Sequence, residues 1–247
     1  MLSSIAQLSG EISFFYKNLI TGETIAHQAD LPLLAASVIK LPIMIEAYRQ
    51  FANGSLDPAL PVTVRTANTV PGCGVLKRLH DGLIVTVKDL VKLMIIVSDN
   101  TATNLLTDIV GIDHVNQTLD TFGMQTTRLR RKMYDLESAA RGLQNTITAA
   151  EIGLLLEKLY YGRAVSPESD LEMLQILKNQ QLNGKIPFFI GDLFEIAHKT
   201  GEDDGITHDV GIVYADTPFI LCCCANKTNV PKTEQWIQNI ARELLYK

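Results

Sequence analysis

Long apolar runs and a strong charge of one sign are both missing from this 247-residue chain. No apolar run approaches the roughly 20 residues needed to cross a bilayer, so we expect no membrane span. The net charge is -5, and basic residues cluster only in the short stretch RLRRK. This balance argues against nucleic acid as a partner. Hydrophobic residues make up 47% of the chain, which is enough for a large globular core.

Cysteine is scarce and shows no pattern of metal ligands. Three of the four cysteines are adjacent, at 222–224, where neighbours on a strand would point to opposite faces, so no disulfide framework is expected. There is no C-x-x-C spacing, and the five histidines show no ligand spacing, so we expect no metal and no other cofactor. Free thiols favour a reducing compartment. The start, MLSSIAQLSG, has no basic segment before an apolar one; we expect a cytoplasmic protein, or an exported one whose signal has been removed.

Strand patterns lie at both ends of the chain, and helical patterns lie between them. EISFFYKNLITGETIAH predicts two strands, FEIAHKTG, HDVGIVYAD and PFILCCCANK predict three more, and KTEQWIQNIARELLY predicts a final helix. The sequence therefore predicts an α+β fold, in which an antiparallel sheet built from both chain ends is flanked by helices and an all-helical lobe is inserted. We expect one domain over 1–247, with an α/β lobe at about 1–48 plus 185–247 and a helical lobe at about 49–184.

A lysine stands inside the apolar run LLAASVIKLPIMIEAYRQF. Pro42 predicts a helix start close to Ser37, because proline is tolerated only in the first turn. The Ser37 hydroxyl would then lie at the positive end of the helix dipole, with Lys40 three residues on and on the same face. A desolvated lysine could serve as the base for a nucleophilic serine. The alternative is an ordinary lysine whose stem reaches solvent.

Two further polar tripeptides complete a pattern. Ser98-Asp99-Asn100 interrupts a helical run, and Lys199-Thr200-Gly201 ends a strand. Alone, the first is typical of a turn between helices and the second of a glycine turn. Together with S-V-I-K at 37–40, in this order, they resemble the motifs of the serine β-lactamase and penicillin-binding-protein superfamily, most closely class A β-lactamases. The resemblance extends to TGETIAH, TVKDLVKLMI and SDNTATNLL and covers essentially the whole chain.

The resemblance implies a catalytic set. Ser37 would attack a carbonyl carbon and form an acyl-enzyme. Lys40 would be the base or proton relay for Ser37. Ser98 would bridge Lys40 and Lys199 and pass a proton to the leaving nitrogen.

A substrate-binding set is implied in the same way. Asn100 would orient Lys40 and the substrate amide, and Lys199 and Thr200 would bind a substrate carboxylate. Gly201 would let the strand lie close to the substrate. The backbone N–H groups of Ser37 and Glu202 would form an oxyanion hole.

The stretch TTRLRRKMYDLESAARGLQNTITAAE departs from the class A pattern. Class A enzymes carry a glutamate there that activates the deacylating water, and an ungapped alignment places Met133 in its position. Asp135 and Glu137 follow two and four residues later, and Glu137 is the best-placed substitute; the alternative is a surface acid on a small helix. Arg131 and Asn145 would bracket the loop, where the family has an arginine–aspartate pair.

A second departure lies after the Lys199 motif. Class A enzymes often hold the antibiotic's carboxylate with an arginine on the following strand, whereas this chain has only Arg242, in its final helix. His208 is a possible substitute; the alternative is a histidine whose hydrogen bonds are satisfied within its strand.

Three functions fit these residues. The first is a class A-like β-lactamase, acting as a monomer on a β-lactam or related acyl compound that bears a carboxylate. The second is a D-alanyl-D-alanine carboxypeptidase or an esterase, and the third is a penicillin-binding sensor that stays acylated. A Ser-His-Asp hydrolase is disfavoured, because there is no G-x-S-x-G elbow and Asp209 directly follows His208.

Overall fold

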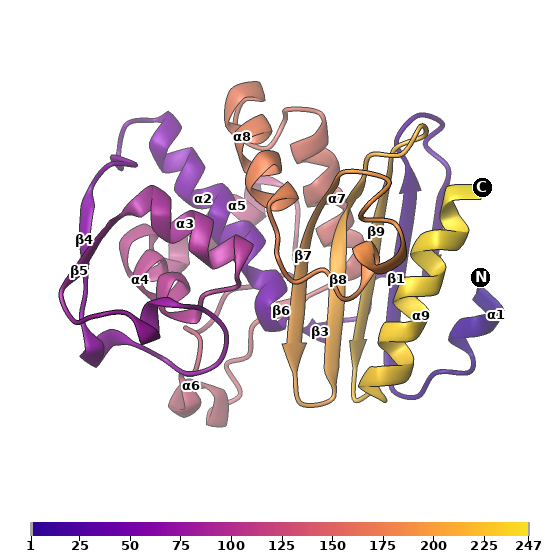
Figure 1. Cartoon of the computed structure of the whole chain (residues 1–247), viewed down its shortest axis with the longest axis horizontal. Helices are drawn as coiled ribbons and strands as arrows, with labels where there is room; N and C mark the ends of the chain where they lie inside the picture. The colour runs from indigo at the N-terminus through magenta and orange to yellow at the C-terminus, as the bar shows by residue number, and fades with distance from the viewer. Residues whose placement is uncertain (1, 247) are drawn as a thin grey trace.

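The computed structural model describes residues 2–246, and it has a five-stranded antiparallel sheet beside a helical lobe (Figure 1). The order of the strands is β2-β1-β9-β8-β7, so strands from both chain ends form one sheet as predicted. No helix within residues 2–246 is long and apolar enough to span a bilayer. The strands of this sheet are β1 (Glu11–Asn18), β2 (Thr24–His27), β7 (Ile196–Asp203), β8 (Ile206–Val213) and β9 (Phe219–Asn226).

The predicted α+β fold with an inserted helical lobe is confirmed. The lobe also contains a short hairpin of β4 (Pro61–Val64) and β5 (Leu83–Thr86), and β3 (Leu33–Leu34) pairs with β6 (Thr146–Ile147). The α-helices are α1 (Leu2–Ile5), α2 (Lys40–Ala52), α3 (Val87–Ile96), α4 (Asn100–Val110), α5 (Ile112–Thr121), α6 (Leu136–Ala140), α7 (Ala149–Tyr160), α8 (Pro167–Lys178) and α9 (Val230–Glu243). Short 3-10 turns are η1 (Ala36–Ile39), η2 (Thr66–Asn68), η3 (Leu76–Arg78), η4 (Ile186–Phe189) and η5 (Leu244–Tyr246).

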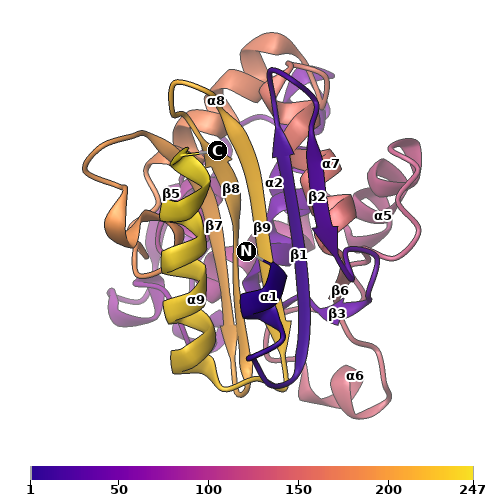
Figure 2. The ribbon, with the colours of Figure 1, turned by 90° about the vertical axis from the view of Figure 1, so that its right-hand side faces the viewer.

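The sheet separates two apolar cores. Helix α9 and the short α1 cover one face, while α7 and the helical lobe lie on the other (Figure 2). Alternation along β9 supplies both cores: Cys222 and Cys224 pack toward the lobe, and Leu221 and Cys223 pack toward α9. The three adjacent cysteines are therefore small buried strand residues.

Edge strand β7 is where the sheet meets the start of α2. A Cβ atom built on Gly201 would lie 3.2 Å from a Val38 methyl group, 3.3 Å from the Ala36 Cβ and 3.0 Å from the His208 ring. Glycine at this position therefore lets β7 pack directly against η1, the turn that carries Ser37. This packing places the turn that carries Ser37 on the edge of the sheet.

We predict that native protein exposes one reactive thiol. Cys73 is exposed, whereas Cys222, Cys223 and Cys224 are buried, and burial raises the pKa of all three. Because the thiolate is the reactive form, an aromatic disulfide reagent should titrate about one thiol in native protein and all four cysteines in denaturant. Cys73→Ser should remove the native signal. Fast labelling of that variant would show that the sheet opens more readily than this packing implies.

Candidate functional site

Ser37 lies in η1, directly before α2. The predicted helix start near Ser37 is confirmed, with a 3-10 turn as its first part and Pro42 in the first turn of α2. Ala36, which precedes Ser37, has a φ of 41°, and this left-handed residue redirects the chain from β3 into the turn. The Ser37 hydroxyl forms no hydrogen bond with another residue of the described chain.

Lys40 is fully buried, which excludes the alternative of a lysine that reaches solvent. Its Nζ donates to the Ser98 carbonyl oxygen at 2.8 Å, to the Ser98 Oγ at 3.0 Å and to the Asn100 Oδ1 at 2.8 Å. All three acceptors are neutral. Burial, followed by repulsion from Lys199, holds the pKa of Lys40 well below its usual value. The ammonium form can donate to all three acceptors, and the lowered pKa makes the neutral amine, with two N–H groups and a free lone pair, accessible as a base.

Ser98 brings two amines to one hydroxyl group. Its Oγ lies 3.0 Å from the Lys40 Nζ and 3.1 Å from the Lys199 Nζ. Ser98 has a φ of 54° in the turn between α3 and α4, and this uncommon conformation aims its side chain between the amines. When both amines donate, the two lone pairs of the hydroxyl are occupied and its proton is free for a third group.

Lys199 is also fully buried, on β7. Its Nζ donates to the Ser98 Oγ and, at 2.8 Å, to the Thr200 carbonyl oxygen. Burial lowers the pKa of Lys199 to about 7, against the opposing influence of the Asp209 carboxylate. Near neutral pH this side chain therefore exchanges between ammonium and amine.

Asp99 anchors the loop in front of the site, a role that the sequence reading did not assign to it. Its Oδ1 caps α4 by accepting from the Ala102 N–H, and its Oδ2 accepts from the N–H groups of Val75 and Leu76 at 2.6 and 2.9 Å. The cap of α4 could be predicted from the sequence, because aspartate is a preferred N-cap residue. The loop contact could not, because it joins residues 23 and 24 positions apart in the chain.

A cavity of about 250 Å³ opens at Ser37. Asn100 joins it to the buried amines, because its Oδ1 accepts from Lys40 while its Nδ2 donates to the Pro71 carbonyl oxygen. The structure thus brings together the predicted residues at 37, 40, 98, 100, 199 and 202. The lining residues are Leu34, Ala35, Ala36, Ser37, Asn100, Arg131, Met133, Tyr134, Leu136, Gln144, Asn145, Glu202, Asp203 and Ile206.

Comparison with known proteins assigns this arrangement to a family. Residues 2–247 match the model of the β-lactamase enzyme family. The chain belongs to that family. It is a serine β-lactamase-like hydrolase, as the three motifs predicted.

Three relatives show the range of this family. A solved β-lactamase from Sphaerobacter thermophilus is 34% identical, with a TM-score of 0.92 over 99% of this chain and 94% of that one. The β-lactamase regulatory protein BlaB from Streptomyces cacaoi is 27% identical over 90% of this chain and 86% of its own. A mutant of PBP-A, solved as its acyl-enzyme complex with penicillin G, is 25% identical, with a TM-score of 0.87 over 99% of this chain and 91% of that one.

The loop of this β-lactamase-family protein between 128 and 146 is closed at its base. Arg128 pairs with Thr146 through two backbone hydrogen bonds. The Asn145 Oδ1 accepts from the Arg131 N–H at 3.0 Å, and the Arg131 guanidinium donates to the Gln144 Oε1. The predicted bracketing by Arg131 and Asn145 is present, but the guanidinium binds Gln144 rather than Asn145.

Met133 is fixed in the wall of the cavity. The Asn104 side chain accepts from the Met133 N–H at 2.8 Å and donates to the Met133 carbonyl oxygen at 2.9 Å. Asp135 caps α6 through the Ser138 N–H, and that hydrogen bond lowers the pKa of Asp135. Glu137 is exposed on α6, and it is not among the described residues that line the cavity. The structure therefore leaves Glu137 outside the cluster, and its role in deacylation stays a prediction.

His208 is a strand residue with satisfied hydrogen bonds. Its Nε2 donates to the Leu34 carbonyl oxygen at 2.8 Å, and its Nδ1 accepts from the Ala225 N–H at 3.1 Å. Burial lowers the pKa of His208 to about 4, so the ring is neutral at physiological pH. Arg242 lies in α9, where its guanidinium stacks over the Phe189 ring. Neither side chain supplies a cation at the cavity.

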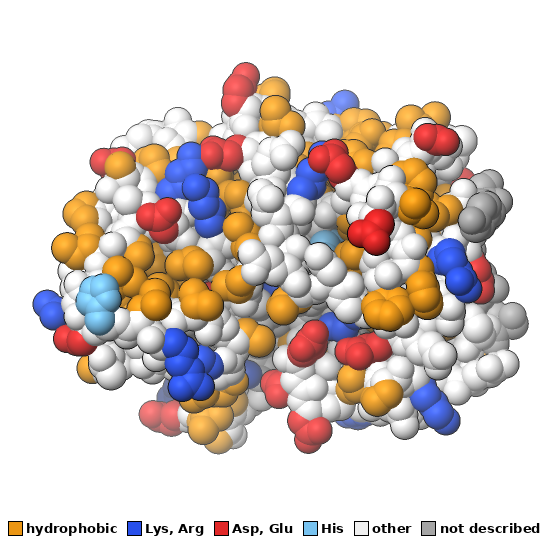
Figure 3. Space-filling model, in the orientation of Figure 1, with side chains coloured by type: hydrophobic (Ala, Val, Ile, Leu, Met, Phe, Trp, Pro, Cys, Tyr) orange, Lys and Arg blue, Asp and Glu red, His pale blue; other side chains and the backbone are white. Residues whose placement is uncertain are grey.

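Charged side chains of both signs are mixed on the surface of the molecule. Positive and negative side chains are interspersed on the face shown in Figure 3, with no continuous basic band. Within the described part of the chain, no group of three or more His, Cys, Asp and Glu side chains could hold a metal ion.

We predict that Asp99→Ala lowers the free energy of unfolding by about 3 kcal/mol, because the N–H groups of Leu76 and Ala102, in buried hydrogen bonds, and that of Val75, in a partly buried one, lose a charged acceptor. Urea denaturation should measure the change. Asp108→Ala on the same helix is the matched control, since Asp108 forms an exposed ion pair with Lys132 and its loss should cost under about 0.5 kcal/mol. Equal losses in the two variants would contradict the anchoring role of Asp99.

Proposed function

We propose that this protein is a class A-like serine hydrolase that opens β-lactam amides through an acyl-enzyme at Ser37 and deacylates slowly. The observation that carries the proposal is the shared Ser98 hydroxyl, which lies within hydrogen-bond distance of two fully buried amines. A structural role would not require two desolvated amines at one hydroxyl, whereas amide opening requires a base and a proton donor within one short relay.

Acylation in this proposal uses the side chains of Ser37, Lys40 and Ser98. The Ser37 Oγ attacks the β-lactam carbonyl carbon, and its proton passes to neutral Lys40. The C–N bond breaks, and Ser98 donates its proton to the leaving nitrogen and is reprotonated from Lys40. The atoms balance, with one ester bond formed, one amide bond broken and one proton moved from Ser37 to nitrogen.

Substrate binding uses the charge of Lys199. In its ammonium form it offers a charge-assisted hydrogen bond to a substrate carboxylate, next to Thr200 on β7. The N–H groups of Ser37 and Glu202 are the proposed oxyanion hole, and both residues line the cavity. The expected substrate is a β-lactam or a related acyl compound with a carboxylate.

Slow deacylation follows from Met133. A thioether is at best a weak hydrogen-bond acceptor and cannot take a proton from water. The carboxylates among the described lining residues are Glu202 and Asp203, at the end of β7, and the 131–145 part of the lining contributes none. Among the described lining residues, no carboxylate on the loop side lies beside the ester to act as a base for water.

A second candidate is a penicillin-binding protein that keeps its acyl group. The Met133 backbone is held on both sides by Asn104, so the thioether occupies the cavity wall stably. Among relatives, a mutant of PBP-A is described as an acyl-enzyme complex with penicillin G, and BlaB is described as a regulatory protein. A D-alanyl-D-alanine carboxypeptidase or an esterase would share the acylation apparatus. Release of D-alanine from a D-Ala-D-Ala peptide would distinguish a carboxypeptidase from the other candidates.

We predict that benzylpenicillin forms a covalent adduct on Ser37 alone. Intact-mass spectrometry over time should show the protein gain one penicillin mass, with slow loss of the adduct for a hydrolase and persistence for a sensor. Ser37→Ala should abolish the adduct. Ser55→Ala, at an exposed serine, is the matched control and should label like the wild type. Labelling of the Ser37 variant would overturn the assignment.

We predict that Met133→Glu accelerates loss of the adduct by about two orders of magnitude, because a carboxylate at this place can take a proton from water. Acylation should change little. The measurement is the decay of the adduct after excess penicillin is removed.

Glu137→Gln tests the remaining loop carboxylate in the same assay. Accumulation of acyl-enzyme in this variant would identify Glu137 as the base, while unchanged decay would exclude it.

For the Met133→Glu variant, slower decay of the adduct than in the wild type would contradict the explanation of slow deacylation.

A further inference from the structure

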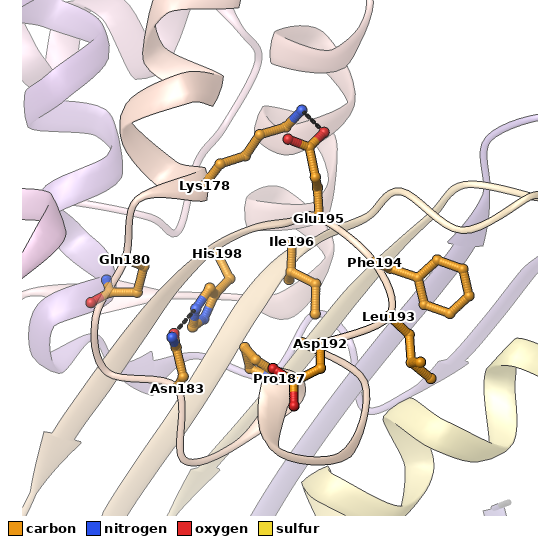
Figure 4. Close-up of a pocket in the computed structure, with 11 residues that line it drawn as sticks. Lys178, Gln180, Asn183, Pro187, Asp192, Leu193, Phe194, Glu195, Ile196 and His198 are labelled. Atoms are coloured by element: carbon orange, nitrogen blue, oxygen red, sulfur yellow. Dashed lines mark hydrogen bonds and ion pairs between the residues drawn. The ribbon is translucent and has the colours of Figure 1, made fainter.

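The connection from α8 to η4 is anchored to the sheet on both sides of Lys185. Before it, the Asn183 side chain lines a cavity of about 440 Å³ beside edge strand β7, where its Oδ1 is 3.1 Å from the Nε2 of the His198 ring (Figure 4). After it, the Ile186 N–H donates to the buried Asp209 carboxylate of β8 at 2.9 Å. Lys185 is therefore held against β7 and β8 by its own neighbours.

The Lys185 side chain places a buried ammonium group where three elements meet. Only 3% of the side chain is exposed. Its Nζ donates to the Glu202 Oε1 of β7 at 2.6 Å and to the His208 carbonyl oxygen of β8 at 3.3 Å. It also lies 3.9 Å from the Glu234 Oε1 of α9. Because desolvation offsets much of the attraction in such a pair, we expect the contact to fix geometry more than it adds stability.

The Glu202 side chain lies on the face of the sheet that α9 covers. Glu202 is opposite Thr207 in the β7–β8 ladder, and the Thr207 Oγ1 donates to the Glu234 carboxylate of α9 at 3.1 Å. Directly opposed residues of a ladder share a face, and adjacent residues of one strand do not. Gly201, which precedes Glu202, packs on the other side against η1. The Glu202 backbone therefore lies between an ion pair on one face and η1 on the other.

This backbone lies close to the end of a strand that is paired on one side only. Strand β7 is at the edge of the sheet and ends at Asp203, and Glu202 lines the cavity at Ser37. We propose that Lys185 is a positioning residue, which holds the Glu202 backbone N–H in place for the developing oxyanion by fixing the Glu202 side chain. This inference rests on the proposed function, since it concerns the oxyanion hole of the same site.

A positioning role of this kind acts on the transition state. Negative charge collects on the β-lactam carbonyl oxygen only as the tetrahedral intermediate forms, so a displaced N–H weakens stabilisation of that charge and leaves binding of the substrate nearly unchanged. Removal of an oxyanion-hole donor costs about 100- to 1,000-fold in rate. Misalignment of a donor that is still present should cost less, about tenfold.

The test uses Lys185→Met, which keeps the length of the side chain and removes its donor. The time course of adduct formation with benzylpenicillin gives the acylation rate constant at saturation and the half-saturating concentration. The rate constant should fall about tenfold, and the half-saturating concentration should stay within about twofold of the wild-type value. The methyl ester of benzylpenicillin has the same carbonyl group and no carboxylate, so it should show the same fall. An effect through the charge of Lys199 would change acylation by the carboxylate-bearing substrate alone.

Two further variants make the result specific. Lys178→Gln removes another cation beside the 440 Å³ cavity, paired with the exposed Glu195, and should acylate like the wild type (Figure 4). Glu202→Ala removes the partner of Lys185 and keeps the backbone N–H, so it should reproduce the effect of Lys185→Met. Both substitutions together should cost no more than one of them, because they remove the same contact.

An unchanged rate constant in Lys185→Met, or a loss confined to the substrate with a carboxylate, would overturn the positioning role. Additive losses in the double variant would overturn it too, by showing that Lys185 does not act through Glu202. If Lys185→Met does not fold, Glu202→Ala changes only an exposed side chain, and an unchanged rate constant there would reject the role. Absence of any adduct in the wild type would reject the proposed function together with this inference, whereas an adduct that forms equally fast in Lys185→Met would reject the inference alone.

Discussion

The rest of the site depends on one constraint, which is that two amines must stay out of water while they share one hydroxyl group. Lys40 comes from the start of α2, Lys199 from edge strand β7 and Ser98 from the turn between α3 and α4. Burial destabilises the ammonium form of each lysine and so makes a neutral amine available at moderate pH. Separation of the three elements would hydrate the amines and remove this property.

The fold maintains the constraint through close backbone packing and strained turns. Gly201 lets β7 lie against η1, because it has no side chain of its own to separate the strand from the Ala36 and Val38 side chains. Ser98 takes a left-handed conformation, and its neighbour Asp99 fixes the loop that crosses in front of it. Strain of this kind persists only where surrounding contacts over-determine the backbone, and Asp99 supplies such contacts. The position of the buried amines and of Ser98 therefore depends both on the packing of β7 against η1 and on the hydrogen bonds of Asp99.

In the proposed mechanism, acylation and deacylation depend on different parts of the molecule. The amines and the Ser98 hydroxyl assigned to acylation are buried and joined by hydrogen bonds, whereas the wall assigned to deacylation belongs to the loop between 128 and 146. That loop is closed by its own contacts, chiefly through Asn145, and is pinned to α4 through Asn104. One residue in its wall can therefore change how long an acyl group stays without disturbing the buried cluster. This separation agrees with a family whose members include both β-lactamases and a regulatory protein.

Local periodicity in the sequence was enough to predict the sheet from both chain ends and the helix start near Ser37. The grouping of Ser37, Lys40, Ser98 and Lys199 was predicted from the resemblance of three short motifs to a known family. The sequence left His208 open between two roles, and it assigned none to Asp99 as a loop anchor. Tertiary structure decided these, since the partners of His208 at Leu34 and Ala225 lie on other strands or segments. The exposed position of Glu137 was likewise set by the path of a loop closed through distant contacts. Hydrogen bonds between residues far apart in the chain leave no local pattern, and burial, which sets the charge of each lysine, is a property of the whole fold.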